Sequence, residues 1–224
     1  MTEAVGRIAA ALAETRAHDV LDIGCGDGGL TRMLTTAGHA VTGLDPSAAA
    51  IAAARERVPE ARFEVAGAES LPFNPHRFDA CIFLNSLHHV PVPEMGRALH
   101  EALRVLRPGG EVIVVEPLAE GPYFEVMRPV EDETEIRRAA IAAIDAVMAA
   151  GEATGPAPVT WRRATPVAGL DAFIDGLARV DPARRAAAEA QRDTLACLLD
   201  RHARRTPDGL VLDQPLRIWR MRPG

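Results

Sequence analysis

A glycine-rich turn near the N-terminus contains the residue types that best suit ligand chemistry. Residues 20–23 form an apolar run with one embedded acid, Asp22, and predict a buried strand; glycines at 24, 26, 28 and 29 follow before a helical pattern begins at Leu30. Glycine has no Cβ, so it adopts positive φ and lets a ligand approach the main chain closely. The free N–H groups at the start of the helix would face that ligand. The stretch therefore predicts a ligand site at a strand-to-helix turn.

A second acid, Asp45, ends the next predicted strand, residues 40–44. A carboxylate at this position can accept hydrogen bonds from both hydroxyls of a ribose. The alternative role, an N-cap for the following helix, suits Ser47 better. Gly24, Gly26 and Gly29 also satisfy the dinucleotide pattern Gly-x-Gly-x-x-Gly, with Asp45 about twenty residues downstream. On these residues alone, an NAD(P)-dependent oxidoreductase remains an open alternative.

The turn also resembles motif I of the class I methyltransferases that use S-adenosylmethionine, in which Asp22, Gly24, Gly26 and Gly28 fill the fixed positions. The resemblance covers about the first half of the chain in family order and continues through residues 43–47, 68–73, 78–90 and 106–110. The acid within the strand and the Pro-Gly-Gly at 108–110 belong to the methyltransferase pattern. They favour it over the dinucleotide alternative.

The resemblance implies S-adenosylmethionine as cofactor and S-adenosylhomocysteine as product. The implied cofactor-binding residues are Asp22, Gly24, Cys25, Gly26, Asp45, Pro46, Ala68, Glu69 and Asn85. The sequence departs from the family pattern at Gly67, where an acid usually holds the adenine amino group. Adenine recognition would then depend on the backbone of Ala68, with Glu69 as a candidate substitute for the missing acid.

A histidine pair, His88 and His89, follows the predicted fourth strand, residues 78–84. Histidine titrates near neutral pH, so either ring is a candidate general base for a hydroxyl or amine acceptor. In similar methyltransferases such a pair often packs and donates hydrogen bonds near a helix start, and we prefer that structural role. No third ligand for a metal is evident, so we expect no metal. The loop lacks the Asn-Pro-Pro-Tyr signature of enzymes that methylate base or amide nitrogens, which favours a small-molecule acceptor.

A segment after the predicted fifth strand, residues 121–128, holds the chain's only tyrosine. We predict that it shields the methyl group from water and supplies the acceptor-binding residues Tyr123, Phe124, Met127 and Arg128. The alternative is a helix start whose aromatic side chains pack into the core.

Composition excludes several function classes. The 224 residues carry a net charge of −6 and no basic stripe, so we expect no nucleic-acid partner. The absence of lysine removes Schiff-base chemistry and the Tyr-x-x-x-Lys pair of many reductases. Three scattered cysteines suit neither a disulfide framework nor a zinc site. With no signal-peptide core and no apolar run of membrane length, we expect a cytoplasmic protein without a membrane partner. We expect it to be a monomer or a homodimer.

Hydrophobic periodicity predicts an α/β fold: a doubly wound, mostly parallel, Rossmann-like sheet with a helical insert or lid after the fifth strand. Helices are expected over residues 2–17, 30–37 and 95–106, and strands over 40–44, 62–65, 78–84 and 111–116. Asp132 and Glu135 have capping-box spacing, Asp181-Pro182 predicts a further helix start, and residues 210–221 predict a terminal strand entered through residues 207–209. The expected domains are 1–117 with 206–224 for the cofactor, and 118–205 for the insert, with one strand near 159–164.

These observations predict an S-adenosylmethionine-dependent methyltransferase that acts on a small molecule. Besides the oxidoreductase, a non-catalytic module that binds S-adenosylmethionine to support a partner chain remains an alternative.

Overall fold

The computed structural model describes residues 3–207 and 209–224. Thr2 and Asp208, which the sequence assigned to the first helix and to the turn before the last strand, lie outside these residues. The chain divides into two compact units. The first comprises the residues up to Glu116 together with Ala139–Val159 and Arg217–Gly224, and the second comprises Pro117–Arg138 and Thr160–Leu216.

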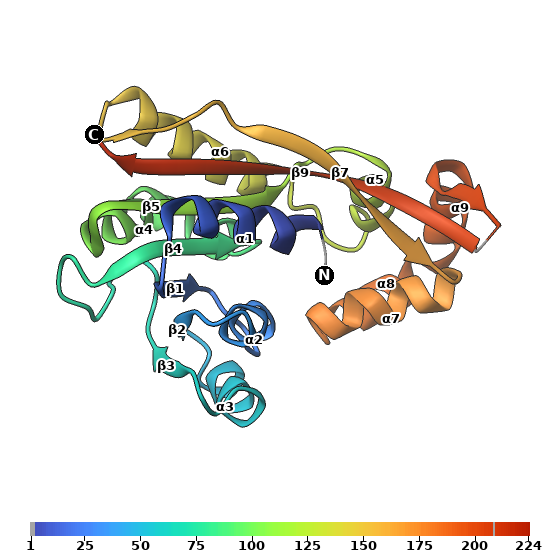
Figure 1. Cartoon of the computed structure of the whole chain (residues 1–224). Coiled ribbons are helices and arrows are strands. Elements are labelled where there is room, and N and C mark those ends of the chain that lie inside the picture. Colours follow the sequence, from blue (N-terminus) through green and yellow to red (C-terminus); the bar gives the residue numbers. More distant parts are fainter. Residues whose placement is uncertain (1–2, 208) are drawn as a thin grey trace. The chain divides into compact units, whose positions relative to one another are not determined.

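A twisted sheet of parallel strands forms the centre of the first unit (Figure 1). Its strands are β1 (Asp19–Ile23), β2 (Ala40–Asp45), β3 (Arg62–Val65), β4 (Phe78–Leu84) and β5 (Leu106–Pro117). The order is β3-β2-β1-β4-β5, followed by β9 (Gly209–Pro223) and β6 (Ala153–Thr154). The pairs β1–β2, β1–β4, β2–β3 and β4–β5 are all parallel. The predicted doubly wound α/β fold is confirmed.

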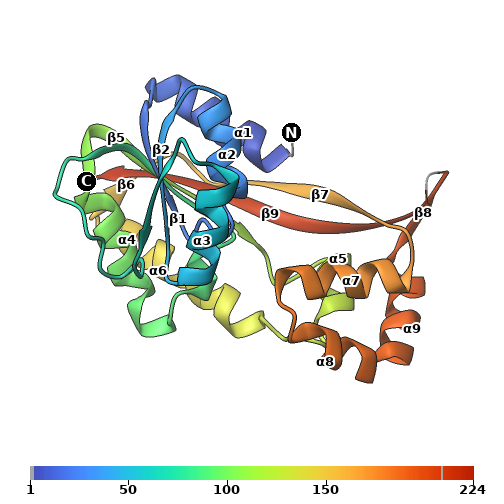
Figure 2. The same cartoon turned by 90° about the horizontal axis from the view of Figure 1, so that it is seen from below.

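Helices cover both faces of this sheet. They are α1 (Glu3–Thr15), α2 (Gly29–Thr36), α3 (Ala48–Arg57), α4 (Met95–Arg104) and α6 (Thr134–Ala149), with short 3₁₀ turns at Leu87–His89 and Val92–Glu94. Figure 2 shows α1 and α2 on one side of the strands and α4 and α6 on the other. The inner strands are buried on both faces because their side chains are mostly apolar, as in β4, where Cys81, Ile82 and Phe83 are fully buried. In the edge strand β3 only Phe63 is buried. Ser47 caps α3 as predicted, accepting a hydrogen bond from the Ala50 N–H.

The helix expected over residues 95–106 ends before the Pro-Gly-Gly at residues 108–110, which belongs to a strand. Helix α4 ends at Arg104, and all three residues lie inside β5, beside an irregularity in the β4–β5 pairing between Phe78 and Ala80. Gly109 has a φ of +82°, and a Cβ on Gly110 would lie 2.7 Å from the Asp79 carbonyl oxygen. Two glycines are therefore needed to carry the strand through this irregularity.

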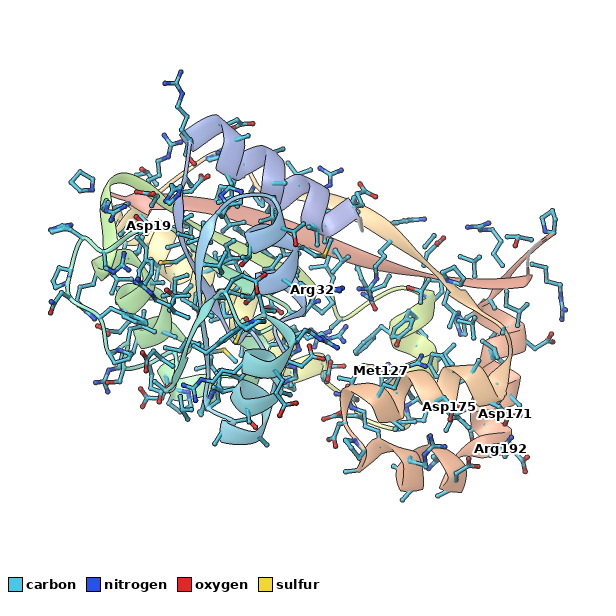
Figure 3. The ribbon with its side chains drawn as sticks, turned by 60° about the horizontal axis from the view of Figure 1, so that its bottom comes forward. Asp19, Arg32, Met127, Asp171, Asp175 and Arg192 are labelled. Atoms are coloured by element: carbon cyan, nitrogen blue, oxygen red, sulfur yellow. The ribbon has the colours of Figure 1, made fainter. Side chains whose placement is uncertain are left out.

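The second unit contains α5 (Pro122–Met127), the first turn of α6, most of β7 (Val159–Val167), α7 (Leu170–Val180), α8 (Arg184–Ala190), α9 (Arg192–His202), β8 (Arg204–Thr206) and the first part of β9. Its apolar core includes Phe124, Met127, Phe173, Leu177 and Leu195. Strands β7 and β8 both pair with β9. On the surface, Arg192 of α9 forms an ion pair with Asp171 of α7 (Figure 3).

Several local expectations in this half of the chain were wrong. Asp132 accepts hydrogen bonds from Thr134 instead of forming a capping box with Glu135. The helix expected after Asp181 is two helices, α8 and α9, separated by a bend at Gln191. The strand expected near residues 159–164 is present and extends to Val167, and a further strand, β6, precedes it and pairs with the end of β9.

The two units also differ from the domain boundaries that the sequence suggested. The sheet unit includes Ala139–Val159, because the apolar side chains of Ala140, Ile144 and Val147 are buried and β6 pairs with the end of β9. No helix among the residues 3–207 and 209–224 has the length and apolar content to cross a membrane.

Candidate cofactor-binding site

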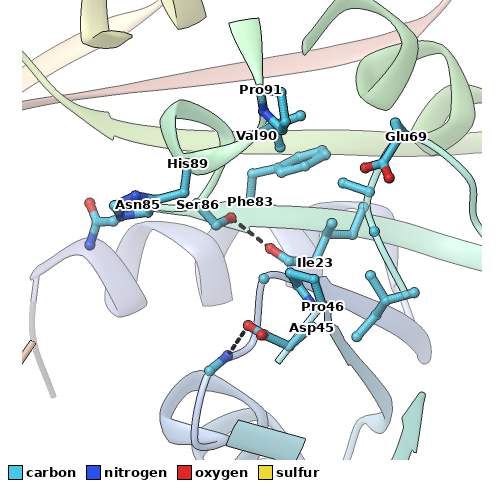
Figure 4. Close-up of a pocket in the computed structure, with 15 residues that line it drawn as sticks. Ile23, Asp45, Pro46, Glu69, Phe83, Asn85, Ser86, His89, Val90 and Pro91 are labelled. Carbon is cyan, nitrogen blue, oxygen red and sulfur yellow. Dashed lines mark hydrogen bonds between the residues drawn. The ribbon is translucent and has the colours of Figure 1, made fainter. Parts of the chain in front are cut away.

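A cavity of about 560 Å³ opens at the carboxyl ends of β1, β2 and β4, within the first unit (Figure 4). The strand order reverses between β1 and β4, so the loops that follow these two strands leave in different directions. Ligands of open α/β sheets bind at such a switch point. Seven of the nine predicted cofactor residues line this cavity: Gly24, Gly26, Asp45, Pro46, Ala68, Glu69 and Asn85.

The glycine turn is held against the end of β2 by hydrogen bonds. The Gly24 and Cys25 N–H groups donate to the Leu44 carbonyl at 2.7 and 3.0 Å, and the Gly26 N–H donates to Asp45 Oδ2 at 3.0 Å. Gly26 has a φ of +53°, and a Cβ built on it would meet no atom within 4 Å. The main chain at Gly26 therefore faces open space in the cavity, which a side chain would enter.

Asp45 uses both carboxylate oxygens to order the loop. Oδ1 accepts from the Ser47 N–H at 2.8 Å while Oδ2 accepts from Gly26. A carboxylate has about four lone-pair positions, so each oxygen keeps capacity for a further donor from the cavity. The geometry leaves Asp45 able to accept hydrogen bonds from a diol.

Asp22 and Cys25 do not line the cavity. The Asp22 side chain is buried and its Oδ2 accepts from Thr31 Oγ1 of α2 at 2.7 Å. Desolvation raises the pKa of Asp22 to about 6, while the Thr31 hydrogen bonds oppose that shift. Burial likewise raises the pKa of the Cys25 thiol, which the charge of Asp22 reinforces. The two residues fix the turn from within the fold, and the sequence pattern could not distinguish this from ligand contact.

The Glu69 carboxylate lies in the space that a side chain at position 67 would fill. A Cβ built on Gly67 would collide with the Glu69 carboxylate, and both residues line the cavity. A carboxylate therefore stands where the family pattern places one, but it comes from two residues further along the chain. Glu69 is the residue that the sequence indicated as a candidate for the role of the missing acid.

Asn85 marks the end of β4 with an unusual backbone. Its φ is +54°, and its Oδ1 is buried without a hydrogen-bond partner among the described residues. Positive φ in a non-glycine residue and an unsatisfied buried acceptor both occur preferentially at functional sites. Next to it, Ser86 Oγ donates to the Ile23 carbonyl at 2.6 Å and closes the space above Gly24 (Figure 4). Sequence reasoning missed Ser86, for which only its place in the loop gave a signal.

The histidine pair divides between the interior and the cavity. His88 is buried, and its Nδ1 forms a hydrogen bond with Glu116, a carboxylate that also accepts from the Leu87 N–H at 2.9 Å. His89 lines the cavity, and its ring lies 4.1 Å from that of His88, centroid to centroid. His88 therefore has the structural role that we preferred, while a general-base role remains a prediction for His89 alone.

The predicted acceptor residues all belong to the second unit. Phe124 and Met127 are 1% and 2% exposed in its core, so they have no surface with which to line a pocket, as the alternative interpretation foresaw. Arg128 is exposed and pairs with Glu125 at 3.3 Å. Tyr123 lines a cavity that lies within the second unit. For Tyr123 and Arg128 the acceptor role remains a prediction.

Residues 20–110, which contain the glycine turn and every residue of the first cavity, match a family model described as a methyltransferase domain. Over these residues the chain is similar to methyltransferase domains. This match includes the strand, turn, Asp45 and Pro-Gly-Gly that sequence reasoning used.

Two curated methyltransferases are similar to this chain over about half of its length. A ubiquinone biosynthesis O-methyltransferase from Alkalilimnicola ehrlichii is 38% identical over 111 residues, which are 47% of this chain and 44% of that protein. A 27-O-demethylrifamycin SV methyltransferase from Amycolatopsis mediterranei is 35% identical over 144 residues, 61% and 50% of the two chains. The chain thus spans about half the length of the curated relatives it matches.

A solved structure extends the likeness of fold to the whole chain. The YcgJ protein from Bacillus subtilis matches with a TM-score of 0.71 at 19% identity and covers 98% of both chains. At this identity the likeness concerns the fold alone.

The raised pKa of Asp22 predicts a specific pH dependence of stability. The folded state holds this proton more tightly than the unfolded state, so the stabilisation is fully present below about pH 3.8 and is lost as pH rises through about 6. Replacing Asp22 by Asn should therefore improve stability relative to wild type by about 2.4 kcal/mol more at pH 7 than at pH 4. Urea unfolding at both pH values measures this difference.

Thr31→Val provides the matched comparison for Asp22→Asn. This change removes the hydroxyl whose hydrogen bond lowers the pKa of Asp22. Stability should therefore fall more steeply with rising pH in Thr31→Val than in wild type. A difference between Asp22→Asn and wild type that is the same at both pH values would contradict the assignment.

Proposed function

We propose that this chain is an S-adenosylmethionine-dependent methyltransferase with a small-molecule acceptor. The observation that carries the proposal is the open space in front of the Gly26 main chain, bordered by the Asp45 carboxylate, at the switch point of the sheet. The match of residues 20–110 to a methyltransferase domain supports it.

The residues present fit an adenosyl cofactor. Asp45 has free acceptor capacity for ribose hydroxyls, and the cradle at Gly26 admits a ligand against the main chain. Glu69 supplies a carboxylate beside Ala68 for an adenine amino group. Asn85 Oδ1 is a buried acceptor that has no donor among the described residues. The ammonium group of an amino-acid moiety would be a suitable donor.

The chemistry asks little of the protein beyond positioning. When bound, S-adenosylmethionine supplies a methyl group that its sulfonium already activates. The chain's own residues then bind, orient and exclude water, which accounts for most of the catalytic effect in such a transfer. Asp45 and the glycine turn fix the cofactor end of the cavity. His89, which also lines the cavity, is the residue placed to take a proton from an acceptor hydroxyl or amine.

A small-molecule acceptor is supported by two considerations. The loop after β4 lacks the Asn-Pro-Pro-Tyr signature, and the matched relatives carry names that describe quinone and rifamycin methylation. Free cysteines at positions 25, 81 and 197 suit a reducing compartment such as the cytoplasm. We further propose that the protein acts as a monomer or homodimer.

Gly26→Val tests whether the turn holds the cofactor. The branched side chain would enter the cavity and resist the positive φ, so affinity for S-adenosylhomocysteine should fall at least 100-fold, about 2.7 kcal/mol. Calorimetry measures this, and wild type should bind S-adenosylmethionine and S-adenosylhomocysteine but neither NAD nor NADP. Binding of NAD or NADP in preference would establish the oxidoreductase alternative.

Gly29→Ala is the matched control for Gly26→Val. Gly29 begins α2, and a Cβ there would meet only Asp27 Oδ1 at an ordinary 3.7 Å. Affinity for S-adenosylhomocysteine should stay within about threefold, or roughly 0.7 kcal/mol. If Gly26→Val and Gly29→Ala bind alike, the turn is not the cofactor cradle.

Moving the carboxylate from residue 69 to residue 67 tests the adenine contact. Glu69→Ala alone should weaken S-adenosylhomocysteine binding by about 1–3 kcal/mol, because the adenine amino group loses a charged acceptor. Adding Gly67→Asp should restore much of that loss, since the new side chain would occupy the space that Glu69 leaves. Calorimetry on both variants decides, and a double variant no better than Glu69→Ala would remove Glu69 from this role.

A further inference from the structure

The loop between β3 and β4 brings two residues to the first cavity without any secondary structure of its own. Residues 66–77 contain no helix or strand, and Ala68 and Glu69 of this loop line the cavity (Figure 4). Such a loop has no hydrogen-bond ladder, so its conformation depends on groups elsewhere in the unit that bond to its main chain. The position of the Glu69 carboxylate therefore depends on those bonds.

Two side chains of α4 bond to the main chain of this loop just after Glu69. The Leu71 N–H donates to Glu101 Oε2 at 2.9 Å. Arg104 donates from Nη2 to the Leu71 carbonyl at 3.2 Å and from Nη1 to the Phe73 carbonyl at 2.9 Å. One helix thus holds the loop at the residues two and four positions after Glu69.

Glu101 and Arg104 also fix each other. Arg104 donates from Nε to Glu101 Oε1 at 2.7 Å and from Nη2 to Glu101 Oε2 at 2.8 Å. This bidentate contact sets the plane of the guanidinium, so the directions of its other N–H groups are set as well. The Arg104 hydrogen bond lowers the pKa of Glu101, and the Glu101 hydrogen bond raises the pKa of Arg104. Both groups therefore stay charged at neutral pH.

This ion pair affects the shape of the loop more than the stability of the fold. The Arg104 and Glu101 side chains are 34% and 20% exposed, and ion pairs as accessible as this contribute little to the free energy of unfolding. Their bonds to the main chain of Leu71 and Phe73, in contrast, restrict the residues that present Glu69 to the cavity.

We propose that Glu101 and Arg104 are positioning residues that determine which purine base the first cavity accepts. By holding the loop, they keep the Glu69 carboxylate at the place where it accepts a hydrogen bond from the exocyclic amino group of adenine. The inference rests on the proposed function, because it takes an adenosyl compound as the ligand.

The selectivity follows from the hydrogen-bonding groups of the two bases. An ionised carboxylate only accepts hydrogen bonds, so it suits the amino group of adenine and repels the carbonyl oxygen that hypoxanthine has at the same position. Hypoxanthine also carries an N1–H, which a carboxylate can reach only by moving along the edge of the base. A loop held by Glu101 and Arg104 prevents that movement, whereas a released loop permits it.

Calorimetry with S-adenosylhomocysteine and S-inosylhomocysteine tests the selectivity on the full chain. Wild type should bind the adenosyl compound about tenfold or more tightly, because a site built to accept from an amino group rejects a base that lacks it. In Arg104→Met this preference should fall about fivefold or more, because the two carbonyls of the loop lose their donors.

Conservative variants separate positioning from a general loss of structure. Arg104→Lys keeps a cationic donor and Glu101→Gln keeps an acceptor for the Leu71 N–H, so both should retain more of the preference than Arg104→Met. The matched control is Arg97→Gln, which changes an exposed arginine of the same helix that pairs with Glu94 at 3.8 Å. Its preference should stay within about twofold of wild type.

A double-mutant cycle tests whether the effect passes through Glu69. Glu69→Ala should itself lose the preference, and adding Arg104→Met to it should change the remaining preference by less than about twofold. Hydrogen exchange without ligand tests the contact itself: the Leu71 amide should exchange about tenfold or more faster in Glu101→Ala than in wild type.

The outcomes distinguish this inference from the proposed function. If wild type binds S-adenosylhomocysteine but shows no preference between the bases, or if Arg104→Met weakens both compounds equally, the positioning role is wrong and the proposed function stands. The same holds if Arg104→Met has an equal effect with and without Glu69, or if the Leu71 amide exchanges at the wild-type rate in Glu101→Ala. A wild type that binds neither compound overturns the proposed function, and the base selectivity with it.

Discussion

One hydrogen bond links the two halves of the cofactor site: the Gly26 N–H donates to the Asp45 carboxylate at 3.0 Å. It joins the turn after β1 to the end of β2, two strands whose parallel register runs from Asp19 with Ala40 to Ile23 with Leu44. The bond requires glycine, because the main chain at this point has positive φ and lies open to the cavity. The positions of the neighbouring loops follow from it, since Asp45 also orders the start of α3 through Ser47.

The two units differ in how their buried charged groups are paired. In the first, the acids around the turn are satisfied by the protein, as Asp22 is by Thr31 and Glu116 by His88. In the second unit, Glu133 pairs with Arg137 and Arg184, and Arg184 also pairs with Glu131, whereas Arg163 has no carboxylate partner among the described residues. Burying an unpaired group sacrifices stability, and proteins retain such groups where a ligand completes them. In the first cavity, Asn85 Oδ1 is such an unsatisfied group.

Much of the first unit was predictable because its signals are local. The glycine spacing, the acid ending β2 and the cap at Ser47 each depend on a few consecutive residues, and the structure places them as expected. What depends on distant partners was not predictable. Glu116 lies 28 residues from His88, and no local pattern links them. Strand β1 is buried on both faces, and the Asp22 carboxylate accepts a hydrogen bond from Thr31. The position of Asp22 in the motif did not indicate this orientation.

The second unit gave weaker signals for the same reason. A helix start within residues 121–128 was one of two interpretations, and the packed core shows that Phe124 and Met127 face inward while Tyr123 lines a cavity. Glu133 pairs with Arg137 four residues away but also with Arg184, 51 residues away, and no local pattern indicates the second pairing. Pairings across tens of residues decide both, and these follow from tertiary packing.

The affinity of Asp45→Ala for S-adenosylhomocysteine tests the central claim most directly. The account predicts a folded variant that binds about 1.5–3 kcal/mol more weakly, because Asp45 both orders the turn and accepts from the ribose. Asp27→Ala, at an exposed acid of the same turn that pairs with Arg57, should bind within about twofold of wild type, roughly 0.4 kcal/mol. Wild-type affinity in folded Asp45→Ala would contradict the account.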